Sequence, residues 1–317
     1  MHPLHQGRQG DEGRLTPSPR PAPSRLPSTE RPHPRSGDLD VRSIPDVVRL
    51  LHAEDLRAVR AVGRVLGTVA RVASLAAFAL EGGGRLIWVG AGTSGRLGAL
   101  DAAECPPTFG TRPSQVVAVV AGGARALRAA VEGAEDHPRD GAERMRRLRV
   151  GPGDLVCGIS ASGRTPFVLG ALAEARRRRA ATALVCCAGR PPRSVPADAV
   201  IAVPTGPELV AGSTRLKAGT ATKLVLNAIS TAAMVRLGKV FRGRMVSLRP
   251  TNQKLRLRAI RTVGDLAGAS PARSRRLLER AGWRVDLALA MAFTGQPTAK
   301  AATLLRGHGL RGLARLR

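Results

Sequence analysis

Two short stretches of the sequence combine glycine with hydroxyl side chains, a combination that suits the binding of a phosphate group. One reads GAGTSGR at 90–96 and the other reads SASGRTP at 160–166, and each lies between an apolar run and a run with helical spacing. The start of a helix offers unpaired backbone N–H groups and the positive end of the helix dipole. Further donors would be the hydroxyls of Thr93, Ser94, Ser160, Ser162 and Thr165.

Each stretch taken alone is also typical of helix capping, because serine and threonine favour the start of a helix. Two such stretches on two strands of one parallel sheet instead favour a shared crevice, since ligands bind beyond the carboxyl ends of the strands. The first stretch lacks the full G-x-G-x-x-G spacing, and no acidic residue ends a following strand to hold a ribose. The sequence also lacks G-x-x-x-x-G-K-[ST], so a sugar monophosphate fits better than a nucleotide.

Two glutamates stand near these stretches in a chain that is poor in acidic residues. Glu104 follows the first stretch by one predicted helix, and Glu135 follows the next strand and its helix. A pair of carboxylates beside a bound sugar can divide the roles of acid and base if their surroundings separate their pKa values. Spacing alone favours the alternative, which is a pair of solvated carboxylates near helix ends.

Alternating strands and helices must position these residues. The strand-like runs are RLIWVG, QVVAVV, DLVCGIS, ATALVCC and AVIAVP; helices are expected from about 96, near 124–131, near 166–178 and over 216–235. Apolar strands that alternate with helices indicate a parallel sheet covered on both faces. We therefore predict an α/β fold with a doubly wound parallel sheet.

The flanking segments differ from this central pattern. Apolar residues at helical spacing over 47–80 predict one long helix or two in succession. Residues 1–38 hold eight prolines and few clustered apolar residues, which predicts a disordered Pro/Arg-rich tail. We assign 39–250 to the sugar-phosphate-binding catalytic domain and 251–317 to a small all-helical C-terminal region. Helix breaks are expected near Ser270-Pro271, Gly282, 295–297 and 307–309.

The composition is strongly basic. The 317 residues carry 51 lysines and arginines against 23 acids, a net charge of +28, and only five of the cations are lysines. Residues 236–317 alone hold 19 cations and three acids, a net charge of +16. Such charge raises the hypothesis of a nucleic-acid partner. Aromatic residues are 2% of the chain, which disfavours single-strand stacking, and a solvated basic face is the favoured alternative.

The remaining composition argues for a cytoplasmic protein without a metal site. The four cysteines lack C-x-x-C spacing and three lie in apolar runs, as expected of buried thiols in a reducing compartment. The six histidines are scattered along the chain. Neither an apolar run long enough to cross a membrane nor a signal-peptide stretch is present.

Four strings together resemble the N-acetylmuramic acid 6-phosphate etherase family. They are GAGTSGRLGALDAAECPPTFG at 90–110, AVEGAED at 130–136, ISASGRTP at 159–166 and AGSTRLKAGTATKLVLN at 211–227. The resemblance is collinear from about residue 28 to near the C-terminus and includes TNQKLRLRA at 251–259. It implies the sugar isomerase (SIS) fold, which agrees with the doubly wound sheet predicted from the strand pattern.

The resemblance implies cleavage of the D-lactyl ether of N-acetylmuramic acid 6-phosphate, which gives N-acetylglucosamine 6-phosphate and D-lactate during peptidoglycan recycling. No metal or organic cofactor is implied. A base removes the C2 proton of the open-chain sugar, lactate leaves from C3, and water adds to the unsaturated aldehyde. By the same resemblance Glu104 is the proton donor and Glu135 the second catalytic carboxylate. Which of the two takes the C2 proton stays open.

The resemblance also extends to binding residues and assembly. The five hydroxyls named above would hold the phosphate, and Lys217 and Thr220 are candidates for closing the site, although a capped helix start explains them equally well. Glu208 lies near the expected crevice, but the sequence provides only a weak case for a catalytic role. A homodimer with sites near the interface is implied. Arg31-Pro32-His33-Pro34 replaces a typical Arg-Asn-Pro string, which could alter a contact between subunits.

A relative of this family, the glucokinase regulatory protein, binds sugar phosphate without catalysis. A non-catalytic, sugar-phosphate-binding regulator is therefore the alternative to an etherase. Both glutamates are present in this chain, which argues for the etherase.

Overall fold

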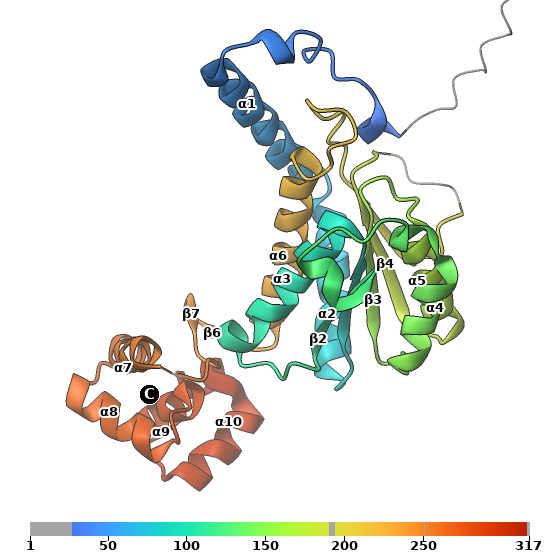
Figure 1. The fold of residues 1–317 in the computed structure, drawn as a ribbon. Helices are drawn as coiled ribbons and strands as arrows, with labels where there is room; N and C mark the ends of the chain where they lie inside the picture. Colours follow the sequence, from blue (N-terminus) through green and yellow to red (C-terminus); the bar gives the residue numbers. More distant parts are fainter. Residues whose placement is uncertain (1–26, 190–193, 251, 316–317) are drawn as a thin grey trace, which may run out of the picture.

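A five-stranded parallel sheet forms the centre of the molecule (Figure 1). The computed structural model describes residues 27–189, 194–250 and 252–315. The strands lie side by side in the order β2-β1-β3-β4-β5. Their bounds are β1 Leu86–Gly90, β2 Val116–Val120, β3 Leu155–Ile159, β4 Ala181–Cys186 and β5 Ala199–Ala202. The predicted doubly wound α/β fold is confirmed.

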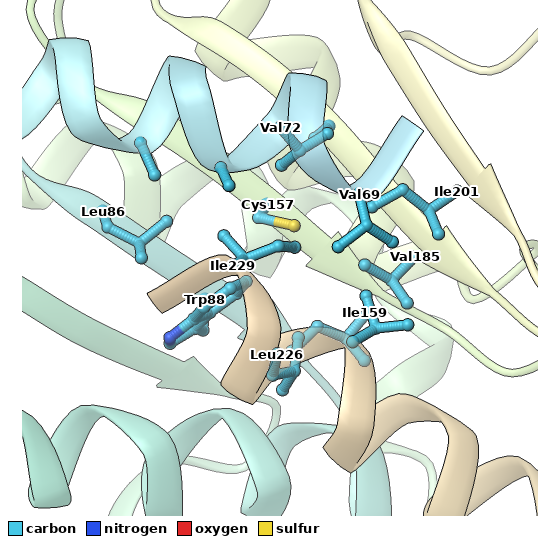
Figure 2. Close-up of a cluster of buried hydrophobic side chains, with 14 of the residues drawn as sticks. Val69, Val72, Leu86, Trp88, Cys157, Ile159, Val185, Ile201, Leu226 and Ile229 are labelled. Carbon is cyan, nitrogen blue, oxygen red and sulfur yellow. The ribbon is translucent and has the colours of Figure 1, made fainter. Parts of the chain in front are cut away.

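Helices cover both faces of the sheet because each central strand is apolar on both sides. On one face lie α2 (Leu66–Glu81), α3 (Gly92–Phe109) and α6 (Lys217–Arg236). Side chains from β1 and β3 pack there against α2 and α6, as Figure 2 shows for Trp88 and Ile159. On the other face lie α4 (Pro138–Arg147) and α5 (Pro166–Arg177).

Helix α1 (Ile44–Gly63) projects from this body as an arm and packs along α6 (Figure 1). It begins where the Ser43 hydroxyl accepts a hydrogen bond from the backbone N–H of Asp46, with a proline in the first turn. The sequence left one helix or two as alternatives, and the chain forms two, α1 and α2. Among the described residues, no single helix has the length and apolar character of a membrane span; α1 and α2 reach it only as a pair bent by 66°.

The C-terminal region forms a helical unit with its own apolar core. A short hairpin, β6 (Val240–Phe241) and β7 (Arg244–Met245), precedes it. The helices are α7 Gln253–Ala267, α8 Pro271–Arg280, α9 Val285–Thr294 and α10 Thr298–Leu313, the last kinked at Gly309. The predicted breaks therefore fall where these helices end or bend.

One local prediction was wrong, and two elements were not predicted. The expected helix near 124–131 is only a 3-10 turn, η3 (Gly123–Leu127), because Gly122 and Gly123 adopt positive φ and delay the start of a helix. Helix α4 was missed, since its sequence is so polar that only Gly141 and Met145 are buried. The β6–β7 hairpin is too short to produce a strand pattern.

The disorder expected for 1–38 does not extend to residues 27–38. Residues 28–30 form the 3-10 turn η1 (Ser28–Glu30), and Thr29 and His33 are buried. A second 3-10 turn, η2 (Leu39–Val41), leads into α1. Hydrogen bonds to distant segments, such as that from Arg35 to Glu54, hold these residues in place. The composition of residues 27–38 alone cannot reveal such contacts. Residues 1–26 lie outside the described part of the chain.

Candidate functional site

The first predicted loop connects β1 to α3. Gly90 and Gly95 let the first turn of α3 pack against the end of the strand, since a Cβ on Gly90 would lie 2.7 Å from the Gly95 nitrogen. The preceding residue, Ala91, makes no side-chain hydrogen bond to the first turn of α3. Thr93 and Ser94 lie half-buried in that turn. The start of α3 therefore offers uncapped N–H groups beside two hydroxyls.

The second predicted loop connects β3 to α5 and gathers three hydroxyls around Ser160. The Ser160 Oγ lies 2.7 Å from Thr165 Oγ1 and 3.5 Å from Ser162 Oγ. The Thr165 backbone N–H also donates to Ser160 Oγ at 3.3 Å. Gly163, at φ 72°, allows the tight turn that brings these residues together. Three oxygens so close together match the size of one phosphate group.

The two loops share one edge of the sheet. Gly90 at the end of β1 is in register with Ile159 at the end of β3. The first loop follows β1 and the second follows β3, so both loops begin at the same level of the sheet. The two strands are hydrogen-bonded neighbours, which are spaced about 4.8 Å apart. The topology therefore places both loops at one edge of the sheet, and a common phosphate-binding crevice for Thr93, Ser94, Ser160, Ser162 and Thr165 stays a prediction.

Glu135 lies at the same edge as the second loop. It is exposed in the 3-10 turn η4 (Ala134–Asp136), directly before α4. Helices α4 and α5 run side by side in the same direction: a Cβ on Gly170 would lie 2.0 Å from the Pro138 carbonyl oxygen, and Arg146 pairs with Glu174 farther along. Because α4 and α5 both start at the carboxyl edge of the sheet, Glu135 and the N-cap of α5 are on one side of the molecule.

Glu104 is remote from both loops within one chain. It lies ten residues after Ser94 in the same helix, which at about 1.5 Å per residue is roughly 15 Å along α3. Its side chain is exposed. Within one chain, Glu104 therefore lies far from Ser94, and its role as proton donor stays a prediction.

Lys217 and Thr220 occupy the first turn of α6, but their polar groups already have partners. Lys217 is 2% exposed, and its Nζ donates to Glu54 Oε2 at 2.6 Å and to the Pro207 carbonyl at 2.7 Å. Thr220 Oγ1 donates to Asp55 Oδ1 at 3.1 Å. The turn itself passes close to the first loop, since a Cβ on Gly219 would lie 3.8 Å from a methyl carbon of Thr93. Direct contact of Lys217 with phosphate stays a prediction.

Glu208 caps α6 from outside the helix. Its carboxylate accepts the backbone N–H of Lys217 at 3.1 Å and that of Ala218 at 2.8 Å. Burial raises the pKa of Glu208, although these two N–H groups and the Lys217 charge oppose the rise. Glu208 is therefore a capping residue in this fold, in keeping with the weak case for a catalytic role.

Two buried acids that hold the site together were missed in the sequence. Asp101 accepts hydrogen bonds from Trp88 Nε1 at 3.0 Å and Ser230 Oγ at 2.8 Å, and so ties α3 to β1 and α6. Burial raises the pKa of Asp101. The sequence did contain a signal for Asp101, because this residue lies in the string GALDAAEC, three residues before Glu104. The other acid is Glu54, and its partner Lys217 is 163 residues away, beyond any local pattern.

Burial alone would raise the pKa of Glu54. Hydrogen bonds from Lys217 and Arg35, and the charges of Lys217 and His33, outweigh that effect and bring the pKa of Glu54 to about 2. This carboxylate therefore stays ionised throughout the physiological range. In the part of the chain that the structure describes, no group of three or more His, Cys, Asp or Glu side chains is placed to hold a metal ion.

Comparison with known proteins identifies the relatives of this chain. The N-acetylmuramic acid 6-phosphate etherase of Gloeobacter violaceus is 50% identical over 89% of this chain and 92% of its own length. That of Cutibacterium acnes is 47% identical over 90% and 93%. A family model of the glucokinase regulatory protein N-terminal SIS domain matches residues 67–176. Among solved structures, a phosphoheptose isomerase from Francisella tularensis has 15% identity and a TM-score of 0.48, over 61% of this chain and all of that one.

The similarity to the etherases runs through both loops and through the segments that carry Glu104 and Glu135, because it covers about nine-tenths of both sequences. Identity near one half over that length is far above what shared fold alone requires. The chain belongs to the N-acetylmuramic acid 6-phosphate etherase family.

Proposed function

We propose that this protein cleaves the D-lactyl ether of N-acetylmuramic acid 6-phosphate and releases N-acetylglucosamine 6-phosphate and D-lactate. The main support is the cluster of three hydroxyls at the end of β3, beside the uncapped start of α3. In this cluster the Ser162 and Thr165 hydroxyls lie within 3.5 Å of Ser160 Oγ. These groups suit the 6-phosphate, which brings its own charge to a site of neutral donors. The etherase names of relatives at 47–50% identity support the same activity.

The reaction would be that of a carbon–oxygen lyase. In the open-chain sugar the C1 aldehyde acidifies the C2 proton, which a base removes. The C3–O bond then breaks, and an acid protonates the lactyl oxygen as lactate leaves. Water adds its hydroxyl to C3 and a proton returns to C2. Glu104 and Glu135 would supply the acid and the base, and the steps themselves call for no metal or organic cofactor.

The proposed enzyme is a homodimer in which Glu104 acts on the crevice of the partner. Glu104 is roughly 15 Å along α3 from Ser94. A sugar whose phosphate is bound at the Ser94 loop of the same chain would not reach Glu104. An apolar face of α1 supports the dimer, because Ile44 is 81% exposed, Val48 58% and Val59 50%. These residues lie on one side of the helix, as a partner-binding face requires.

Residues 39–250 would form the catalytic domain, onto which the folded residues 27–38 pack, and the helical unit of 251–317 would be an addition to it. A cytoplasmic setting would match a role in amino-sugar recycling. The Arg-rich surface of the C-terminal unit has no place in the proposed chemistry.

The test of the activity is D-lactate release from N-acetylmuramic acid 6-phosphate by the purified protein. In D2O the sugar product should carry one deuterium at C2, and in ¹⁸O-labelled water the label should enter the C3 hydroxyl and not the lactate. Label in the lactate would contradict elimination and addition. A folded protein that binds the sugar phosphate tightly without releasing lactate would instead be the non-catalytic regulator.

The test of the dimer uses two inactive variants. If Glu104 serves the partner's crevice, mixed dimers of Glu104→Gln and Glu135→Gln subunits have one intact site. An equal mixture should then regain about a quarter of the wild-type activity after subunit exchange, because half of the dimers are mixed and one of their two sites is complete. No recovery, with subunit exchange verified by differently tagged chains, would contradict a shared site.

A further inference from the structure

A buried cluster of charge lies beside the phosphate loops, centred on Glu54 of α1. The residue is 3% exposed, yet its carboxylate meets four cationic or titratable groups. Lys217 Nζ lies 2.6 Å away, an Arg35 nitrogen 2.7 Å, an Arg57 nitrogen 3.2 Å and His33 Nε2 3.3 Å. One carboxylate is thus the shared anchor of side chains from three separate segments.

Two of these side chains come from the segment before α1, residues 28–35, which we call the strap. The Arg35 backbone N–H donates to His33 Nδ1 at 3.1 Å, which leaves the other ring nitrogen, Nε2, to face Glu54. Burial lowers the pKa of His33, and this effect outweighs the opposing attraction of the Glu54 carboxylate. Arg35 fastens the strap to Glu54 by an ion pair of 2.7 Å.

The other end of the strap reaches two loops at the carboxyl edge of the sheet. The Ser28 hydroxyl donates to the Ala188 carbonyl at 3.2 Å, directly after β4. The Thr29 carbonyl accepts the Gly212 N–H at 3.3 Å, in the loop that leads to α6. The strap therefore bridges α1, the end of β4 and the segment before α6.

Lys217 links this cluster to the phosphate loops. Its ammonium is bound to Glu54, while its backbone begins the turn of α6 in which Gly219 approaches Thr93. Glu54 and Lys217 also line a cavity of about 210 Å³, together with Arg215 and Thr220. A shift of Glu54 would move Lys217, and with it the turn that packs against the first loop.

On these grounds, and resting on the proposed function, we propose that Arg35 and Glu54 are positioning residues for sugar-phosphate binding. The strap, fastened by Arg35 to Glu54, holds Lys217 and the first turn of α6 against the Thr93 loop. Neither residue touches the reacting carbons. Loosening the strap should therefore weaken binding of the whole ligand more than it slows the chemical steps.

Arg35→Ala tests this without leaving a buried charge unpaired, because Lys217 and Arg57 still neutralise Glu54. The matched control is Arg57→Ala. Arg57 also pairs with Glu54 and is likewise exposed, but it belongs to α1 itself and does not fasten the strap. We expect Arg35→Ala to raise KM at least about 5-fold with kcat within about 2-fold, as loss of uniform binding does. Arg57→Ala should leave both constants near wild type.

Arg35→Lys should restore part of the lost affinity, since a lysine keeps the charge but not the planar guanidinium. Equal effects of Arg35→Ala and Arg57→Ala, or a fall in kcat with no change in KM, would overturn the proposal. The same variants are compared by calorimetric titration with N-acetylglucosamine 6-phosphate, which requires binding but no turnover. If the wild type binds this ligand but releases no lactate, the proposed function fails, and the titration still decides on the strap.

Discussion

The hydroxyl loops and the Glu54 cluster lie at the same edge of one sheet, yet they are opposite in character. The loops present neutral hydroxyls at helix starts that lack side-chain caps, and they are half-buried apart from Ser160. The cluster consists of charged groups that are already paired, and the first turn of α6 beside it is capped by Glu208. We call the loops the open region, because their helix starts have no side-chain cap, and the cluster the closed region, because its charged groups are already paired.

This difference shows why charge is a poor guide to the site. An anion needs donors without a competing carboxylate, and the loops meet that condition. Lys217 has the charge that a phosphate would attract, but Glu54 already holds it at 2.6 Å. A paired, buried ammonium supports the fold, whereas an uncapped helix start can receive a ligand. Variants in each region test this difference.

The largest effect is expected from Glu54→Gln, in the closed region. Removal of one partner from a buried ion pair leaves Lys217 without its counter-charge, so the free energy of unfolding should fall by about 3–5 kcal/mol. Urea unfolding measures this. The control is Glu143→Gln, an exposed acid paired with Arg146 and Arg147, which should cost less than about 1 kcal/mol. Similar losses in both variants would show that the cluster is not special.

The same residue predicts how stability depends on pH. The pKa of Glu54 is about 2 in the folded chain, below its ordinary 4.5. A lowered pKa in the folded state means that the stabilisation is complete above about pH 4.5 and is lost as the pH falls towards 2. The difference in unfolding free energy between wild type and Glu54→Gln should shrink over that interval. A difference that stays constant down to pH 2 would contradict the ionised state.

Next in size is the effect of Glu135→Gln on turnover. Loss of a general acid or base lowers the rate by about 100-fold or more, and we expect this for kcat in the lactate assay. The matched control is Glu132→Gln, an exposed carboxylate three residues earlier. A wild-type rate in Glu135→Gln would remove Glu135 from the mechanism, and an equal loss in Glu132→Gln would point to a general disturbance of this turn.

A smaller effect is expected from Ser160→Ala, in the open region. It deletes the oxygen that Thr165 and Ser162 both approach, so the affinity for N-acetylglucosamine 6-phosphate should fall by about 10-fold, as one lost hydrogen bond to a charged ligand implies. Calorimetric titration measures this loss. Ser74→Ala, on the exposed side of α2, is the control. Unchanged affinity in Ser160→Ala would place the phosphate elsewhere.

The smallest effect concerns Thr29, whose buried hydroxyl has no hydrogen-bond partner among the described residues. A buried, unpaired hydroxyl costs stability, so Thr29→Val should raise the free energy of unfolding by up to about 1 kcal/mol. Denaturant unfolding shows the sign. A loss of stability would mean that this hydroxyl has a partner, such as a bound water, and that the strap depends on it.

Local patterns predicted the sheet, both loops and most helices, because buried strands and helix starts are determined by neighbouring residues. The strap and the Glu54–Lys217 pair were beyond reach for the opposite reason, since they join segments 163 residues apart. Glu104 shows the limit for the site itself. Its place in the string AECPPTFG is plain, but only the helix geometry shows how far it lies from Ser94 along α3.

Binding of the substrate phosphate by the hydroxyl loops is tested most directly by comparing two substrates. The measurement is kcat/KM for D-lactate release from N-acetylmuramic acid 6-phosphate and from unphosphorylated N-acetylmuramic acid. We expect removal of the phosphate to lower kcat/KM by about 1,000-fold or more, because binding energy from a remote group assists the reaction. Equal values for the two substrates would contradict it.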